Sequence, residues 1–104
     1  MTSHLSRLAE AHAARPLGTV SCFTVTGHAD PGFLPRILGM VAKLGRVPLR
    51  CHADLIGPED GGSQTLDLLV AGMNSDQRDL MAARIGEMFG VTSVLVAERV
   101  QQAA

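Results

Sequence analysis

The spacing of hydrophobic and polar residues predicts a strand followed by a helix in the first half of the chain. Residues 19–26 are rich in β-branched side chains, and Phe23 and Val25 alternate with polar neighbours, which is typical of a strand. Residues 27–32 then carry turn-forming glycine, aspartate and proline. The next residues predict a helix, because apolar side chains recur at helical spacing at Leu34, Ile37, Val41 and Leu44. Gly45 is expected to end this helix.

Residues 47–55 predict a second strand whose two faces differ in character. Apolar and polar side chains alternate along it with a period of two. Pro48, near its start, is typical of a strand at the edge of a sheet, because proline cannot donate a ladder hydrogen bond. The apolar face consists of Leu49, Cys51, Ala53 and Leu55, and the polar face of Arg50, His52 and Asp54.

The remainder of the chain predicts a strand, a helix and a final strand. A glycine-rich loop leads to alternating apolar residues over 64–71, which indicate the third strand. Asn74 and Gln77 have the spacing of a capping box, so we expect a helix to begin there and Gly90 to end it. Residues 91–100 are rich in valine and form the last predicted strand.

The predicted order is therefore β-α-β-β-α-β, which is the order of the ferredoxin-like, split βαβ fold of the α+β class. A short amphipathic helix over 3–15, ended by Pro16, is expected before it. We thus predict three parts: an N-terminal helix with its connection over 1–16, a two-layer βαββαβ sandwich over 17–100, and a tail over 101–104.

Two helices on one face of a four-stranded sheet leave the other face open. The domain is small, so an open face with apolar side chains indicates a partner that covers it. We therefore expect a homodimer or a higher homo-oligomer. The apolar residues predicted for the open face are Val20, Cys22, Leu69 and Leu95.

Composition and charge exclude several partner classes. The 104 residues carry 9 Lys+Arg against 10 Asp+Glu, a net charge of −1, which argues against nucleic acid or an anionic membrane as the main partner. Trp and Tyr are absent and Phe occurs only three times, which argues against aromatic platforms for base stacking. No signal peptide and no apolar run long enough to span a membrane is recognisable, and a cytoplasmic protein is expected.

The two cysteines, Cys22 and Cys51, predict neither a disulfide framework nor a metal site. No CxxC motif and no Cys/His pair at ligand spacing occurs in the chain. We expect both cysteines to be small, buried or half-buried hydrophobic residues. No metal and no cofactor is predicted.

His52 and Asp67 are the main candidates for catalysis. If residues 55–64 connect two paired strands, Asp67 lies opposite His52 on the open face, and a histidine–carboxylate pair could act as a base. A cross-strand surface pair or a dimer contact is the favoured interpretation, because no nucleophile, metal-ligand set or oxyanion loop accompanies the pair. The chain is therefore not expected to be an enzyme.

Residues 28–37, which join the first strand to the first helix, contain the most informative motif. Free N–H groups at the start of a helix bind carboxylates well, and Gly32 would let a ligand approach the backbone. The alternative is an ordinary turn in which Pro31-Gly32 begins a helix. The residues alone leave both interpretations open.

In this region the chain resembles the ACT domain family, over about residues 19–98. The resemblance rests on Pro31-Gly32-Phe33-Leu34 followed by Ile37, on Lys43-Leu44-Gly45 and on the β-α-β-β-α-β order. It implies a domain that binds a free amino acid at a dimer interface through amides at the helix start. The residues implied in binding are Asp30, Pro31, Gly32, Phe33 and Leu34, together with Arg46, Val47 and Pro48 of a second protomer.

Two positions depart from the family's pattern. The family usually has Asp or Asn where this chain has Ala29, and it often has Asn where this chain has Val47. Those polar residues help to hold the ligand in the family, so the departures favour regulation through protein contacts over amino-acid sensing by the dimer itself.

Within the family, the chain is similar to the short regulatory subunit of acetolactate synthase over residues 34–45, 66–70 and 91–94. That similarity implies a non-catalytic subunit that binds and activates a thiamine-diphosphate-dependent catalytic subunit in branched-chain amino-acid biosynthesis. A free-standing dimer that senses an amino acid is the alternative, and a small enzyme that uses His52 and Asp67 is the least favoured hypothesis.

Overall fold

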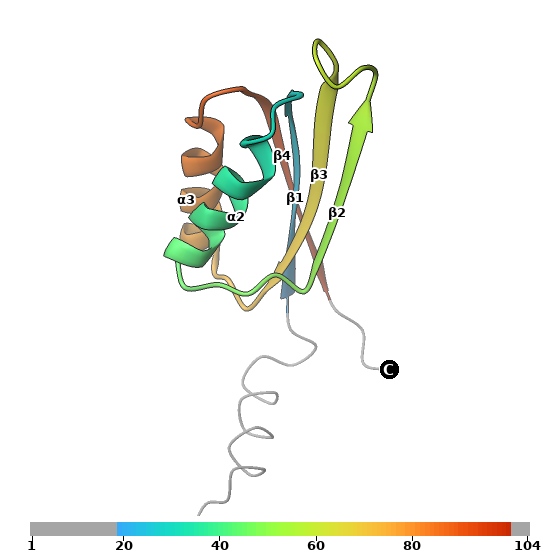
Figure 1. Cartoon of the computed structure of the whole chain (residues 1–104). Helices are drawn as coiled ribbons and strands as arrows, with labels where there is room; N and C mark the ends of the chain where they lie inside the picture. Colours follow the sequence, from blue (N-terminus) through green and yellow to red (C-terminus); the bar gives the residue numbers. More distant parts are fainter. Residues whose placement is uncertain (1–18, 101–104) are drawn as a thin grey trace, which may run out of the picture.

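The computed structural model describes residues 19–100, so the predicted N-terminal helix and the tail over 101–104 lie outside the described residues. Four strands and two helices follow one another in the predicted βαββαβ order of the ferredoxin-like fold (Figure 1). The elements are β1 (Thr19–His28), α2 (Phe33–Lys43), β2 (Arg50–Ile56), β3 (Ser63–Ala71), α3 (Ser75–Gly86) and β4 (Val91–Val100).

The four strands form one antiparallel sheet in the order β2-β3-β1-β4. Both helices lie on the same face of this sheet (Figure 1). Phe23 of β1 pairs with Leu68 of β3 and Val96 of β4, and its side chain faces the helices. Successive strand residues point to opposite faces, so the neighbouring Cys22 and its partner Leu69 lie on the open face.

The core lies between the helices and the three strands β3, β1 and β4. Ile37 and Val41 of α2 are each 1% exposed and pack against strand residues that are fully buried. Leu44 packs against the edge of this cluster and is half-buried. The predicted helix phase and core are thus confirmed, and the strand residues concerned are Phe23, Val25, Leu66, Leu68 and Val70.

Local signals in the sequence begin and end the helices. Gly45, with a φ of 75°, follows α2, and the N–H of Arg46 donates to the carbonyl of Val41, which is the pattern of a Schellman cap. At the start of α3 the Asn74 side chain accepts from the N–H of Gln77 at 2.8 Å, and the Gln77 side chain accepts from the N–H of Asn74 at 2.9 Å. The predicted capping box is therefore confirmed.

The predicted end of the second helix was too late. α3 ends at Gly86, and Gly90 lies four residues further on. The chain must reverse within this stretch to enter β4, and the N–H of Val91 donates to the carbonyl of Met88 in the turn. Gly90 has a φ of 87°, so it serves this turn rather than the helix.

Strand β2 differs most from its prediction. It begins at Arg50 rather than at residue 47, because Pro48 cannot donate to the ladder and pairing starts with the N–H of Leu49, which donates to Leu69. The edge position that Pro48 predicted is confirmed. The predicted apolar face of β2 is not buried by the helices: every residue of β2 is exposed, and Leu55 is 47% exposed.

Val20 was also placed incorrectly among the exposed residues of the open face. It points to that face by its register, yet it is only 6% exposed. Cys22 and Leu69 are half-buried, whereas Leu95 is 66% exposed. Of the four apolar residues predicted for the open face, Leu95 is therefore the one that is largely exposed.

Gly27 holds the end of β1 against the start of α2. A side chain at this position would collide with the ring of Phe33 and with the carbonyl of Gly90. The close approach keeps the β1–α2 loop next to the α3–β4 turn, and β1 continues to His28, two residues beyond its prediction. The loop that follows is thereby fixed at the end of the sheet.

We expect Val41→Ala and Leu68→Ala each to lower the free energy of unfolding by roughly 2–4 kcal/mol, through lost transfer energy and a residual cavity. Both side chains are at most 1% exposed. Denaturant unfolding measures the loss. Leu95→Ala, at a residue that is 66% exposed, is the matched control and should cost about 0.5 kcal/mol or less. Equal effects for all three variants would contradict this core.

Candidate functional site

The β1–α2 loop, residues 29–32, is fastened to both neighbouring loops by backbone hydrogen bonds. The N–H of His28 donates to the carbonyl of Gly90 at 3.0 Å, and the N–H of Ala29 donates to the carbonyl of Gly62 at 2.9 Å. The N–H of Asp30 donates to the side-chain oxygen of Gln64 at 3.1 Å. The start of α2 is therefore presented by a loop with a defined conformation.

An ion pair between Asp30 and Arg36 closes the amino end of α2. Nη2 of Arg36 donates to Oδ2 of Asp30 at 2.6 Å, and the same carboxylate accepts from the N–H of Gly32. Nη2 of Arg36 also donates to the carbonyl of Phe89 at 3.2 Å, and its guanidinium lies 5.9 Å from the centre of the Phe89 ring. The pair thus joins the β1–α2 loop to the α3–β4 turn.

These contacts leave few backbone donors at the helix start for an outside anion. The N–H of Phe33 donates to the carbonyl of Asp30, and the N–H of Arg36 donates to the carbonyl of Gly32. Pro35 has no N–H. Leu34 is therefore the one residue of the first turn whose N–H has no bond to another part of the described chain. A carboxylate of the chain itself already occupies the place where a helix terminus attracts an anion.

The role of Gly32 follows from the same ion pair. Its φ is −84°, which any residue adopts, so conformational freedom does not require glycine there. A side chain at this position would meet the guanidinium of Arg36. Glycine therefore makes room for the Arg36 side chain to reach Asp30 across the backbone.

Arg36 lowers the pKa of the Asp30 carboxyl below its ordinary value of 3.8, and the N–H of Gly32 lowers it further. A pKa that is lower in the folded chain stabilises the fold at pH values above the unfolded pKa. That stabilisation is lost as the pH falls through the folded pKa. The pair is solvent-accessible, with Asp30 37% and Arg36 35% exposed, so solvent screens it in part.

The other residues implied in amino-acid binding lie in different environments. Phe33 is 1% exposed and belongs to the core, Leu34 is half-buried and Pro31 is exposed. Residues 46–48 follow the carboxyl end of α2, at the opposite end of the helix from the β1–α2 loop (Figure 1). One chain therefore does not bring the two groups together, and Val47 is 84% exposed.

A pocket of about 340 Å³ adjoins the β1–α2 loop. The pocket is lined by Ala29, Asp30, Pro31, Leu55, Glu59 and Gln64.

Four residues of this region were not identified from the sequence. They are Arg36 and Phe89, which take part in the ion-pair arrangement, and Glu59 and Gln64, which line the pocket. Arg36 lies one turn after Gly32, and that spacing is the signal that would have identified it.

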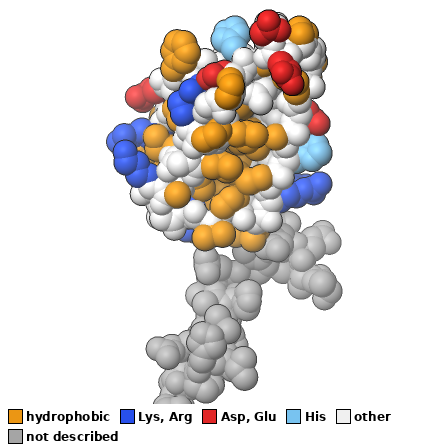
Figure 2. All heavy atoms as spheres, in the orientation of Figure 1, with side chains coloured by type: hydrophobic (Ala, Val, Ile, Leu, Met, Phe, Trp, Pro, Cys, Tyr) orange, Lys and Arg blue, Asp and Glu red, His pale blue; other side chains and the backbone are white. Residues whose placement is uncertain are grey.

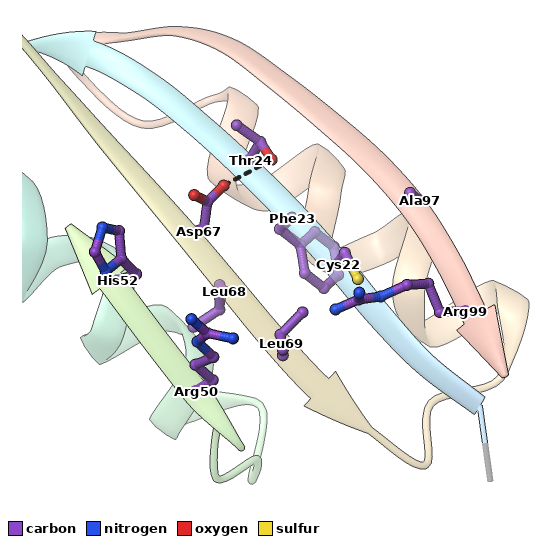
Figure 3. Close-up of a pocket in the computed structure, with 10 residues that line it drawn as sticks. All are labelled: Cys22, Phe23, Thr24, Arg50, His52, Asp67, Leu68, Leu69, Ala97 and Arg99. Carbon is purple, nitrogen blue, oxygen red and sulfur yellow. Dashed lines mark hydrogen bonds between the residues drawn. The ribbon is translucent and has the colours of Figure 1, made fainter. Parts of the chain in front are cut away.

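The open face holds a second pocket, of about 410 Å³ (Figure 3). His52 of β2 pairs in register with Asp67 of β3, as predicted. Asp67, however, accepts from the hydroxyl of Thr24 at 2.9 Å, and Nε2 of His52 lies 3.1 Å from the carboxylate of Asp54. Each member of the proposed catalytic pair therefore has a different partner, which agrees with an arrangement of surface side chains.

The two cysteines differ in burial and both are free. Cys22 is half-buried, as predicted, but Cys51 is exposed, because the helices do not cover β2. Within residues 19–100, no three His, Cys, Asp or Glu side chains lie close enough to hold a metal ion together. No helix in that range is long and apolar enough to cross a membrane.

Comparison with solved structures places this fold beside that of ACT domains. The ACT domain of GTP pyrophosphokinase from Chlorobium tepidum matches with a TM-score of 0.65 at 18% identity, covering 77% of this chain and 99% of that chain. The C-terminal domain of MgtC from Mycobacterium tuberculosis matches with a TM-score of 0.65 at 12% identity, covering 86% of this chain and 97% of that chain. No protein-family model and no curated protein matches the sequence. The likeness establishes the ferredoxin-like fold that ACT domains have.

We expect Arg36→Gln to raise the pKa of the Asp30 carboxyl toward 3.8, because the variant removes its main hydrogen-bond donor. A carboxyl-detected NMR titration measures this pKa directly. Arg84→Gln removes the same charge from an exposed position on α3 and should leave the titration of Asp30 unchanged. An unaltered pKa in the Arg36 variant would show that the ion pair does not form in solution.

Proposed function

We propose that this chain is a non-catalytic regulatory subunit of the ACT type that acts through contacts with other protein chains. The observation that carries the proposal is the Asp30–Arg36 ion pair at the amino end of α2. In the ACT family, the corresponding loop is where a free amino acid is expected to bind. Here a carboxylate of the chain itself lies on that backbone, so an amino acid would have to displace it.

Two further features support this interpretation of the loop. Ala29 and Val47 stand where the family's polar ligand-holding residues are expected, and neither side chain offers a hydrogen bond. Gly32, which would admit a ligand to the backbone, faces the Arg36 guanidinium instead. Each feature removes part of the affinity that such a site would need.

We propose that a second copy of the chain pairs with the edge of β2. This strand has one hydrogen-bonded neighbour, so its outer backbone groups are available to another strand. The helix-side row of β2, which is Leu49, Cys51, Ala53 and Leu55, is apolar and exposed. Figure 2 shows hydrophobic side chains gathered over the region between α2 and β2. Two copies related by a two-fold axis would continue the sheet and cover this row.

This edge is a better site for a homodimer than the open face. The other edge strand, β4, packs against α3 on its helix side, whereas of the two described helices neither α2 nor α3 packs closely on β2. On the open face, Val20 is already buried and the half-buried Cys22 and Leu69 lie among charged side chains. The open face also exposes Leu95, but the helix side of β2 is an exposed apolar row that lies along a free strand edge.

We propose that the catalytic partner is a thiamine-diphosphate-dependent acetolactate synthase. The similarity to the short regulatory subunit of that enzyme over residues 34–45, 66–70 and 91–94 supports this partner. A regulatory subunit shifts a conformational equilibrium only if it binds one state of the enzyme more tightly than the other. The contact with the catalytic subunit must therefore be selective for one of its states.

A dimer that senses an amino acid is the second candidate. The pocket of about 340 Å³ beside the β1–α2 loop favours it, because Glu59 and Gln64 there could bind an ammonium group. An enzyme that uses His52 and Asp67 has less support, since each residue pairs with another side chain.

We expect calorimetry of the wild-type chain against the common amino acids to find no dissociation constant below about 1 mM. Asp30→Ala should create measurable binding, because it frees the N–H of Gly32 and the guanidinium of Arg36 for an outside carboxylate. Asp76→Ala, at an exposed aspartate in α3, is the matched control. Tight binding by the wild type that Gly32→Val abolishes would instead favour the sensing dimer.

We expect sedimentation to show a wild-type dimer at micromolar concentration and a monomer for Leu55→Lys, since a buried lysine would oppose the β2 contact. Leu95→Lys introduces the same charge on the open face and should remain dimeric. The opposite result, a monomer for Leu95→Lys alone, would place the interface on the open face. A monomeric wild-type chain would contradict the dimer altogether.

A further inference from the structure

The register of the sheet places two arginines around a partly apolar row on the open face. Arg50 of β2 pairs with Leu69, Leu69 with Cys22, and Cys22 with Ala97 of β4. Arg99 follows Ala97 by two residues and therefore points to the same face. These residues line the pocket of about 410 Å³, which is within the size range of small-molecule sites.

The two arginine side chains turn toward the middle of the pocket. Figure 3 shows the Arg99 guanidinium directed inward near Cys22 and the Arg50 guanidinium directed toward Leu69. Their strands lie three strand spacings apart, about 14 Å at the backbone, and both long side chains extend into that gap. Neither guanidinium forms an ion pair with a carboxylate of residues 19–100.

The carboxylates near the pocket contact other side chains and not the two arginines. The Asp54 carboxylate lies against Nε2 of His52. Asp67, one row further along the sheet, uses Oδ1 to accept from Thr24 and keeps Oδ2 as an acceptor. The pocket therefore has an arginine on each of two opposite sides, an apolar floor between them, and a hydrogen-bond acceptor at Asp67 one row further along β3.

We propose that this pocket binds a small organic anion with a short aliphatic body and a terminal hydroxyl group. A carboxylate or phosphate head binds the two guanidinium groups, which hold such oxygens through paired hydrogen bonds. The aliphatic body lies on Leu69, Cys22 and Ala97, and the hydroxyl donates to Asp67. The site is separate from the β1–α2 loop, and its two β2 residues, Arg50 and His52, point to the face opposite the apolar row of that strand, so it does not depend on the proposed function.

The test is an NMR titration of the full chain with 4-hydroxybutanoate, and with inorganic phosphate as an anion without an aliphatic body. We expect 4-hydroxybutanoate to shift amide signals of β2, β3 and β4, with a dissociation constant on the order of millimolar for so small a molecule. Phosphate should bind more weakly, between the same two arginines. Butane-1,4-diol, which lacks the charge, should cause no shift, and butanoate, which lacks the hydroxyl, should bind less tightly.

Arg50→Gln and Arg99→Gln should each weaken the binding of 4-hydroxybutanoate about tenfold, as loss of a charge-assisted hydrogen bond does. Arg84→Gln on α3 is the matched control and should bind like the wild type. Thermal unfolding confirms that each variant is folded. The proposal is overturned if about 10 mM 4-hydroxybutanoate shifts no open-face signal, or if the two variants bind like the wild type. It is also overturned if they change the sedimentation of the free chain, because the face would then be an interface between copies.

Discussion

The ion pair between Asp30 and Arg36 is the interaction on which the functional interpretation depends. It places a carboxylate and a guanidinium over the first turn of α2, where the backbone would otherwise attract an outside anion. It also ties that turn to the carbonyl of Phe89, beyond α3. The loop in which the ACT resemblance predicts an amino acid thus carries an anion of the chain itself. This arrangement supports the proposal that the chain acts through contacts with other chains.

The second constraint is that two short helices cover only part of a four-stranded sheet. They bury β1 and the inner face of β3, and they leave β2 exposed on both faces. The helix side of β2 is apolar, whereas the open face of the sheet carries Arg50, Arg99, His52 and Asp67. The two surfaces therefore suit different partners: the edge of β2 suits a second copy of the chain, and the open face suits a polar ligand.

The sequence predicts the fold well because its signals are local. Alternation in the strands, the capping box at Asn74 and the glycine stop at Gly45 each depend on residues that are close in the chain. The exposure of Cys51 and Leu55 was not predictable in this way, because periodicity identifies an apolar face but not how far the helices reach across the sheet. The burial of Val20 was likewise not predictable, because periodicity and register place it on the open face.

The sequence predicted where the candidate site lies but not which side chains interact there. The Pro31-Gly32 start of the helix identified the loop. The Gly32 backbone is closely approached, as predicted, but by the Arg36 guanidinium and not by a ligand. Phe89 lies 53 residues from Arg36, so no local pattern connects them. The arrangement of Arg50 and Arg99 required the strand order, which places β2 and β4 at opposite edges of one sheet.

We propose that the chain acts on an enzyme and not on a substrate. The most direct test is to capture the partner enzyme from the native host with the tagged chain, and to measure acetolactate formation by that enzyme with and without the purified chain. We predict that the purified chain alone forms no acetolactate, and that adding it changes the rate or the feedback sensitivity of the captured enzyme. Turnover by the chain alone, or an enzyme whose rate and feedback response are unchanged by the chain, would contradict the account.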